Sequence, residues 1–345
     1  MSILDVMDVL SIIVMYLDTP TWIKFSYTCQ LANSFKHNQQ LMDNKEMRIK
    51  NLEVYYQTFS PPKKRLFDIF KKQHKKKAIQ YNTTLKEIDV PITPLLFIRS
   101  LDLSYNFTRT RVRILQDSSI INLNVSGCYY LDCSDLSCLT QLESLKADGT
   151  CVTDAVLSTL TNLRKLSVSA CRDVTCDTFL HMSKLQDLNI SFCQGITDKG
   201  FENLSNITKL NMSGCVLVSN ESLEFIKNVR VLSLRQCKQI TDVGLCHLSK
   251  VVDLNIAGCN LVTDVGICNL DSVKTLILDG CGKLTDKALS PLGGVRRLSV
   301  RNCVRLTDAC LDHLHCIQFL DVSDCYQISQ KSLSKLSFCS VTKKC

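Results

Sequence analysis

The chain has 345 residues, of which 45% are hydrophobic and 21% charged, with a formal net charge of +8 and 20 cysteines. This composition excludes a disordered or collagen-like chain, and the length suffices for two domains or one long repeat array. So many cysteines are typical of secreted disulfide scaffolds, but such scaffolds are usually short.

The apolar N-terminal segment, residues 1–17, differs from a signal peptide. No basic region precedes it, Asp5 and Asp8 interrupt it, and no small-residue cleavage site follows. No apolar run reaches the roughly 18 residues that a membrane-spanning helix needs. We therefore expect a reducing, cytoplasmic or also nuclear location, with the cysteines as thiols and no membrane partner.

Two short helices are predicted at the N-terminus. The first carries apolar residues at helical spacing, namely Leu10, Ile13, Val14 and Leu17. The second begins at Pro20, behind the N-cap residue Thr19, and carries Trp22 and Phe25. Two helices this short do not bury their apolar faces alone, so they need a third element or a partner.

This stretch resembles an F-box. The matching residues are Asp8-Val9-Leu10, Ile13-Val14, Tyr16-Leu17-Asp18, Trp22-Ile23-Lys24-Phe25-Ser26 and Cys29. It departs from the pattern at Asp5-Val6, Thr28 and Ala32, where the family has leucine-proline, valine and tryptophan. F-box helices dock onto a small adaptor linked to a cullin. The resemblance therefore implies an adaptor-binding face made by Asp8, Leu10, Ile13, Leu17, Trp22 and Phe25. The alternative is a helical cap on a solenoid.

The positive charge is concentrated in residues 61–77. Eight basic residues against Asp68 give this segment +7, so the other 328 residues carry +8 − 7 = +1. Three interpretations stay open: a nuclear-import signal, a contact with nucleic acid or an anionic membrane, and a solvated linker helix. In the last of these, Leu66, Ile69 and Phe70 pack against the solenoid cap.

A period of 22 residues organises the rest of the chain. One unit reads Leu185-x-x-Leu188-x-Ile190-x-x-Cys193-x-x-Ile196-Thr197-Asp198-x-x-Phe201-x-x-Leu204. Its cysteine recurs in a column comprising Cys128, Cys171, Cys193, Cys215, Cys237, Cys259, Cys281, Cys303 and Cys325, with Thr150 between the first two. We expect about eleven repeats from residue 98 to residue 338, with Asn106 at the corner position of the first.

The repeat resembles the cysteine-containing subclass of leucine-rich repeats. This resemblance predicts an α/β solenoid, with a parallel concave sheet and short convex helical turns whose N-cap oxygens come from the recurring Thr-Asp pair. The cysteine column is open to two readings, because thiols about 5 Å apart are within disulfide reach. We expect structural thiols, since the column is odd-numbered and buried.

No catalytic motif is present. The six histidines pair with no nucleophile, no C-x-x-C occurs, and the cluster His313, His315, Cys316 lacks a fourth ligand. We expect no enzymatic activity, metal or cofactor, and no groove-reading motif supports nucleic-acid binding. The concave positions predict a small polar floor at Ser167, Asn189, Asn211, Ser233 and Asn255. They predict partner-binding residues at Arg235, Asp279, Arg297, Arg301, Phe319, Asp321 and Asp324.

These patterns predict an F-box-like region at 1–40, a basic linker and cap at 41–97, a solenoid at 98–338 and a tail at 339–345. The resemblance implies the substrate-recognition subunit of an SCF-type cullin–RING ubiquitin ligase, with an adaptor and a protein substrate as partners. The first alternative is an interaction scaffold with no ligase attached. The second is a nuclear or membrane-tethered binder that works through the basic segment.

Overall fold

The structure of the chain is a computed structural model that describes residues 46–48, 99–105, 112–116, 120–336 and 339–343. The chain divides into two units, Met1–Leu145 and Lys146–Cys345. The first unit contains β1, β2, β3 and the start of β4, at Glu46–Arg48, Ser100–Asp102, Asn122–Asn124 and Ser144–Lys146. Its helical turns η2 and η3 lie at Arg113–Leu115 and Cys133–Cys138.

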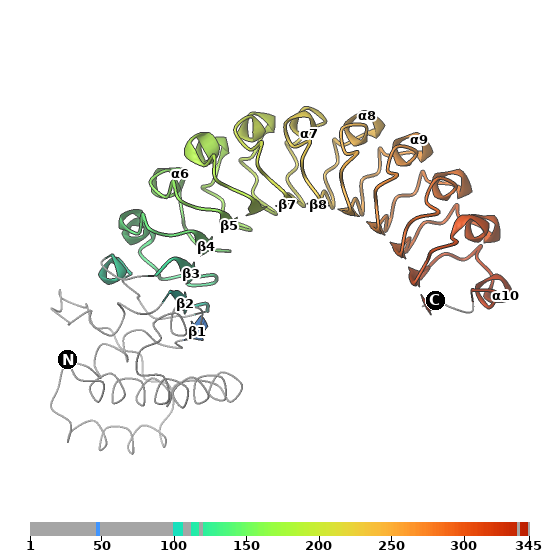
Figure 1. Cartoon of the computed structure of the whole chain (residues 1–345), viewed down its shortest axis with the longest axis horizontal. Coiled ribbons are helices and arrows are strands. Elements are labelled where there is room, and N and C mark those ends of the chain that lie inside the picture. Colours follow the sequence, from blue (N-terminus) through green and yellow to red (C-terminus); the bar gives the residue numbers. More distant parts are fainter. Residues whose placement is uncertain (1–45, 49–98, 106–111, 117–119, 337–338, 344–345) are drawn as a thin grey trace, which may run out of the picture. The chain divides into compact units, whose positions relative to one another are not determined.

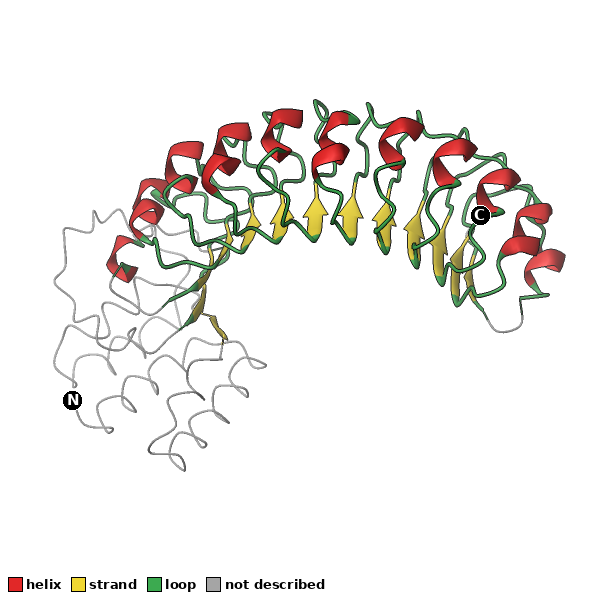
Figure 2. Ribbon diagram, turned by 45° about the horizontal axis from the view of Figure 1, so that its top comes forward, coloured by secondary structure: helices red, strands yellow, loops and turns green. Residues whose placement is uncertain are grey.

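The second unit repeats one strand and one helical turn about every 22 residues. Its strands are β5 Lys165–Ser167, β6 Asp187–Asn189, β7 Lys209–Asn211, β8 Val231–Ser233, β9 Asp253–Asn255, β10 Thr275–Ile277, β11 Arg297–Ser299, β12 Phe319–Asp321 and β13 Ser340–Thr342. The turns are α6 Asp154–Leu157, η4 Cys176–His181, η5 Asp198–Phe201, α7 Glu221–Phe225, α8 Asp242–Leu245, α9 Asp264–Ile267, η6 Asp286–Leu289, η7 Asp308–His313 and α10 Gln330–Leu333. Within this unit the strands lie on one side and the helical turns on the other (Figures 1 and 2).

The apolar positions of the repeat form the core. Neighbouring strands pair in parallel and in register, so that Leu188 lies between Leu166 and Leu210. In the repeat that spans residues 185–204, Leu188, Ile190, Ile196 and the other apolar positions of the pattern are at most 1% exposed. Because each repeat places the same residues at the same height, the structure is the leucine-rich-repeat solenoid that the sequence predicts.

The parallel sheet continues beyond the last predicted repeat. Residues 339–345 were expected to form a C-terminal tail, but Ser340–Thr342 within them form β13. Val341 pairs with Leu320 of β12, at the position that leucine holds in other strands. A β-branched residue suits this half-buried strand position, which the cysteine spacing alone did not reveal.

The nine cysteines of the column are buried. Each thiol donates a hydrogen bond to a backbone carbonyl of the preceding repeat; the Cys215 Sγ, for example, lies 3.2 Å from the Ile190 oxygen. The same oxygen also accepts the Cys193 N–H at 3.1 Å. Burial raises the pKa of the Cys215 and Cys303 thiols from 9.0 to about 12. The column therefore joins repeats by thiol hydrogen bonds, with no disulfide.

The Thr-Asp pairs link neighbouring repeats, and this corrects the sequence interpretation. The Thr-Asp pair was expected to supply N-cap oxygens to its own helical turn, but the Asp264 carboxylate accepts the Thr285 N–H at 2.8 Å through Oδ1 and the Thr285 hydroxyl at 2.6 Å through Oδ2. The repeat length brings the two turns side by side, so the carboxylate reaches the next corner more readily than its own. The threonine hydroxyl caps its own turn in some repeats, as Thr263 does for the Val265 N–H.

Asn220 and Cys176 take the aspartate position in two other repeats. Asn220 accepts the Thr241 N–H at 3.0 Å and donates its amide to the Thr241 hydroxyl at 2.9 Å. In another repeat the Cys176 sulfur lies 3.1 Å from the Thr197 nitrogen. An amide thus preserves both hydrogen bonds of the carboxylate, because the threonine hydroxyl serves as donor or acceptor.

Replacing Asp264 tests this link between repeats. Asp264→Ala leaves the Thr285 N–H and hydroxyl without their acceptor, and we expect the free energy of unfolding to fall by about 1–3 kcal/mol. Asp264→Asn reproduces the arrangement at Asn220 and is expected to cost less than about 1 kcal/mol. Urea unfolding of the two variants measures both. Equal losses would contradict the assigned hydrogen bonds.

The buried thiols predict a loss of stability at alkaline pH. Their folded pKa values are raised, so their contribution is complete below pH 9.0 and is lost as the pH rises towards 12. Each thiol that ionises only in the unfolded chain lowers the free energy of unfolding by up to about 1.4 kcal/mol per pH unit. Urea unfolding between pH 8 and pH 10 under reducing conditions measures the slope.

Two double variants separate this effect from other titrations. Replacing Cys215 and Cys303 by alanine removes two buried thiols, and the slope is expected to become shallower. Replacing the exposed Cys246 and Cys268 by alanine is the matched control and should leave the slope unchanged. The same slope in both variants would show that the column does not cause the alkaline loss.

Candidate functional site

The outward-facing strand residues of the second unit form a polar floor on the concave face, which we define as the strand side of that unit. The position after the strand leucine holds Ser167, Asn189, Asn211, Ser233 and Asn255, all half-buried. Their side chains bond to one another and to the backbone: the Asn189 amide donates to the Ser167 hydroxyl at 3.0 Å. This floor is stabilised within the protein itself and offers little charge to a partner.

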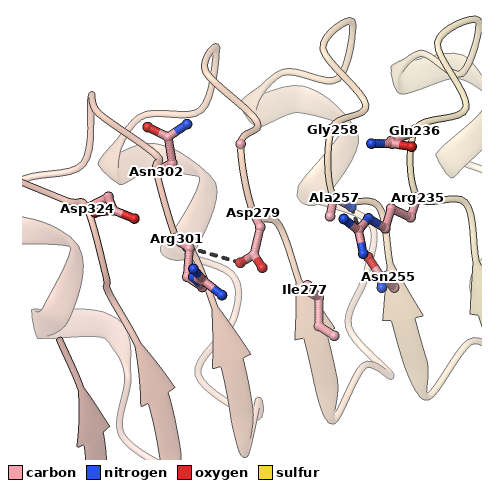
Figure 3. A pocket seen from close by; sticks show the side chains of 11 residues that line it. Arg235, Gln236, Asn255, Ala257, Gly258, Ile277, Asp279, Arg301, Asn302 and Asp324 are labelled. Carbon is pink, nitrogen blue, oxygen red and sulfur yellow. Dashed lines mark hydrogen bonds between the residues drawn. The ribbon is translucent and has the colours of Figure 1, made fainter. Parts of the chain in front are cut away.

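A hollow of about 470 Å³ opens in this face across β8 to β11 (Figure 3). Its floor is recessed because small residues line it. These are Ala257, Gly258 and, one repeat after Gly258, Gly280. Gly258 and Gly280 have φ angles of 72° and 71°, a left-handed conformation that glycine adopts without steric cost. The lining residues are Arg235, Gln236, Asn255, Ala257, Gly258, Ile277, Asp279, Gly280, Arg301, Asn302 and Asp324.

The walls of the hollow come from the same backbone position in repeats that lack the glycine. Gln236, with φ of 61°, stands on one side, and Asn302 and Asp324, with φ of 55° and 61°, stand on the other. A side chain in this conformation is uncommon and costs conformational energy. The hollow thus lies where two consecutive repeats have glycine at this position, between repeats that have a side chain there.

Asp279 is held rigidly at the centre of the hollow. Its Oδ1 accepts the Ser299 hydroxyl at 2.6 Å and the Arg301 backbone N–H at 3.0 Å. Within the described part of the chain, Oδ2 has no hydrogen-bond donor, and Asp279 projects from its strand end beside Arg301 in Figure 3. One carboxylate oxygen therefore positions the side chain and the other is available to a ligand.

Arg235 and Arg301 border the hollow from the same position of repeats three apart. Both are exposed. Neither guanidinium has a carboxylate oxygen within ion-pair distance among the residues that the structure describes. Unpaired guanidinium groups on a rigid sheet are suited to binding carboxylates or other anions.

The other predicted concave residues lie beside the hollow. Arg297 places its guanidinium carbon 5.5 Å from the centre of the Phe319 ring, a cation–π contact on neighbouring strands. Asp321 accepts the Ser323 backbone N–H at 3.0 Å and its hydroxyl at 2.7 Å, so it stabilises its own corner. Of the seven predicted residues, the structure brings Arg235, Asp279, Arg301 and Asp324 together.

Sequence reasoning missed Gln236, Ile277 and Asn302 as lining residues. The signal that points to them is the occurrence of glycine at the left-handed position in two consecutive repeats, Gly258 and Gly280. Each glycine alone is ordinary, and only the stacking of the repeats turns the pair into a depression.

Several sequence predictions lie outside the described residues. These are the proposed adaptor-binding residues Asp8, Leu10, Ile13, Leu17, Trp22 and Phe25, the basic segment 61–77, and Asn106. Within the described ranges, no group of three or more histidine, cysteine, aspartate or glutamate side chains is arranged to hold a metal ion. Among the same residues, no helix is long and apolar enough to cross a membrane.

Comparison with known proteins agrees with the repeat architecture. The family model described as a leucine-rich repeat matches residues 181–205. A search of curated protein sequences finds no significant match.

Several solved structures have a similar fold. A chain in the crystal structure of the yeast Rad7–Elc1 complex is 16% identical with a TM-score of 0.62, over 92% of this chain and 87% of that one. An internalin from Listeria monocytogenes is 17% identical with a TM-score of 0.56, over 74% of this chain and 82% of that one. A chain in the mouse RP105/MD-1 complex is 17% identical with a TM-score of 0.53, over 67% of this chain and 43% of that one. The chain is therefore a leucine-rich-repeat solenoid, a fold used for protein–protein interaction.

Proposed function

We propose that this chain is the substrate-recognition subunit of an SCF-type cullin–RING ubiquitin ligase. The helices predicted within residues 8–29 bind the adaptor, and the concave face of the solenoid holds the protein to be modified. The chain itself carries out no chemistry and acts by bringing its two partners together.

The observation that carries the proposal is the order of the two parts along the chain. An F-box-like sequence at residues 8–29 precedes a leucine-rich-repeat solenoid, and this order is a known architecture of ligase substrate receptors. The similarity in fold to a chain of the Rad7–Elc1 complex also supports the proposed adaptor binding, because that structure is a complex of two proteins. The similarity extends over 92% of this chain.

The concave face supports the second half of the proposal. Arg235, Asp279 and Arg301 present charged groups that the protein does not neutralise by ion pairs within its described part. Such groups on a solenoid sheet are typical anchors for a bound protein, because the sheet fixes the backbone from which they project.

Adaptor capture by the full-length chain tests the proposal. We expect the wild-type chain to retain the SCF adaptor through size-exclusion chromatography as a 1:1 complex. Leu10→Asp combined with Trp22→Ala removes two of the apolar anchors implied by the F-box resemblance, and should weaken capture at least tenfold. Isothermal titration calorimetry measures this change, about 1.4 kcal/mol or more.

The matched control changes an exposed apolar residue elsewhere. Val243 is 65% exposed on the convex side, and Val243→Ala is expected to leave adaptor capture unchanged. Thermal melts of all three proteins check that the solenoid remains folded. A wild-type chain that does not bind the adaptor, or a double variant that binds as well as wild type, would refute the ligase assignment.

A further inference from the structure

The second half of the concave face carries an excess of unpaired positive charge. The segments 230–235, 252–257, 274–279 and 296–301 contain β8 to β11 and the residues beside them. At the positions that face outward from these strands, the charged residues are Arg235, Arg297 and Arg301 against Asp253 and Asp279. All three arginine side chains are exposed, and none has an ion-pair partner within the described ranges. Charge complementarity therefore favours an acidic partner.

The floor of the hollow offers one donor and one acceptor side by side. Asn255 accepts the Ala257 N–H at 3.0 Å through Oδ1, which leaves its Nδ2 without a hydrogen-bond acceptor among the described residues. Asp279, on the next repeat, has Oδ2 open. A peptide backbone carries one carbonyl acceptor and one N–H donor per residue, which is the complement of this pair.

The two bordering arginines set a spacing. Arg235 and Arg301 are three repeats apart, which corresponds to about 14–15 Å at the strand separation of a β-sheet. An extended peptide advances about 3.4 Å per residue, so residues i and i+4 are about 13–14 Å apart. An even separation also places both side chains on the same face of the peptide.

We propose that the hollow across β8 to β11 binds an extended acidic peptide segment of the recruited protein. Acidic side chains at i and i+4 contact Arg235 and Arg301, and the backbone between them bonds to Asn255 and Asp279. The inference rests on the proposed function only for the role of this segment as the recognised part of a substrate. Binding itself requires no adaptor.

The acidic groups in the hollow favour a peptide over a nucleic acid. Asp279 and Asp324 both line it, between and beside the two arginines. A continuous phosphate backbone would bring negative charge against both carboxylates. A peptide with acidic residues only at i and i+4 places neutral groups there instead.

Fluorescence anisotropy with the full-length chain and labelled synthetic peptides tests the proposal. The probes are nonapeptides of serine and glycine with two glutamates separated by i+2, i+3, i+4, i+5 or i+6. We expect the tightest binding at i+4, at least tenfold tighter than at i+2, and weaker binding as the salt concentration rises. The same peptide with lysine in place of glutamate should not bind.

Five variants locate the site. Arg235→Glu and Arg301→Glu should each weaken the i+4 peptide at least tenfold, and the pair together should prefer the lysine peptide. Arg172→Glu makes the same charge change at an exposed residue outside the hollow and should have no effect. Arg301→Gln provides a neutral replacement of similar length should charge reversal disturb the fold, which thermal melting checks.

The outcomes separate this site from the ligase assignment. Equal affinity at all spacings, equal binding of the lysine peptide, or tighter binding of a thymidine oligonucleotide than of any peptide would overturn the peptide site. Because the assay contains no adaptor, a failure of adaptor capture leaves a spacing-dependent result intact and refutes only the ligase role. A bound adaptor with no spacing-dependent peptide binding refutes only the peptide site.

Discussion

The solenoid depends on a polar group that each repeat turns into its apolar interior. At the corners joined by the cysteine column, a carbonyl oxygen such as that of Ile190 receives one backbone N–H from its own repeat and a second donor from the next. The cysteine thiol supplies this second donor because it is small, apolar enough to be buried, and still able to donate. A thiol one residue out of place would leave the oxygen unsatisfied, so the ladder fixes the register of neighbouring repeats.

Fixed register is what creates the candidate binding surface on the concave side. Residues 22 positions apart become neighbours, so a column such as Arg235, Ala257, Asp279 and Arg301 runs directly across the sheet. The core and the corner ladder do not use these positions. Charge, size and backbone conformation at the strand ends therefore vary from repeat to repeat while the stacking is preserved, and the hollow over Gly258 and Gly280 arises from that freedom.

The regular part of this structure was predictable from the sequence because it repeats. The spacing of Cys193 and Cys215, with leucines at fixed offsets, predicts strand, corner and core positions, and these agree with the fold. The partner of Asp264 was not predictable, because only the distance between neighbouring turns decides whether a carboxylate caps its own helix or the next. The hollow was missed for the same reason: its shape depends on glycines in adjacent repeats, whereas sequence reasoning examined each repeat singly.

The location of the hollow also bears on how a partner is discriminated. Asp279 uses one oxygen to bond to β11 and its neighbouring corner, so its position is set by the sheet before any ligand arrives. The exposed guanidinium groups of Arg235 and Arg301 have no such restraint from an ion pair in the described part of the chain. A rigid central acceptor between mobile cations penalises a misplaced acidic residue at the centre and tolerates small errors at the ends. For the proposed peptide, selectivity should therefore depend mainly on the absence of negative charge from its middle residues. The acidic residues at its two ends add to this selectivity.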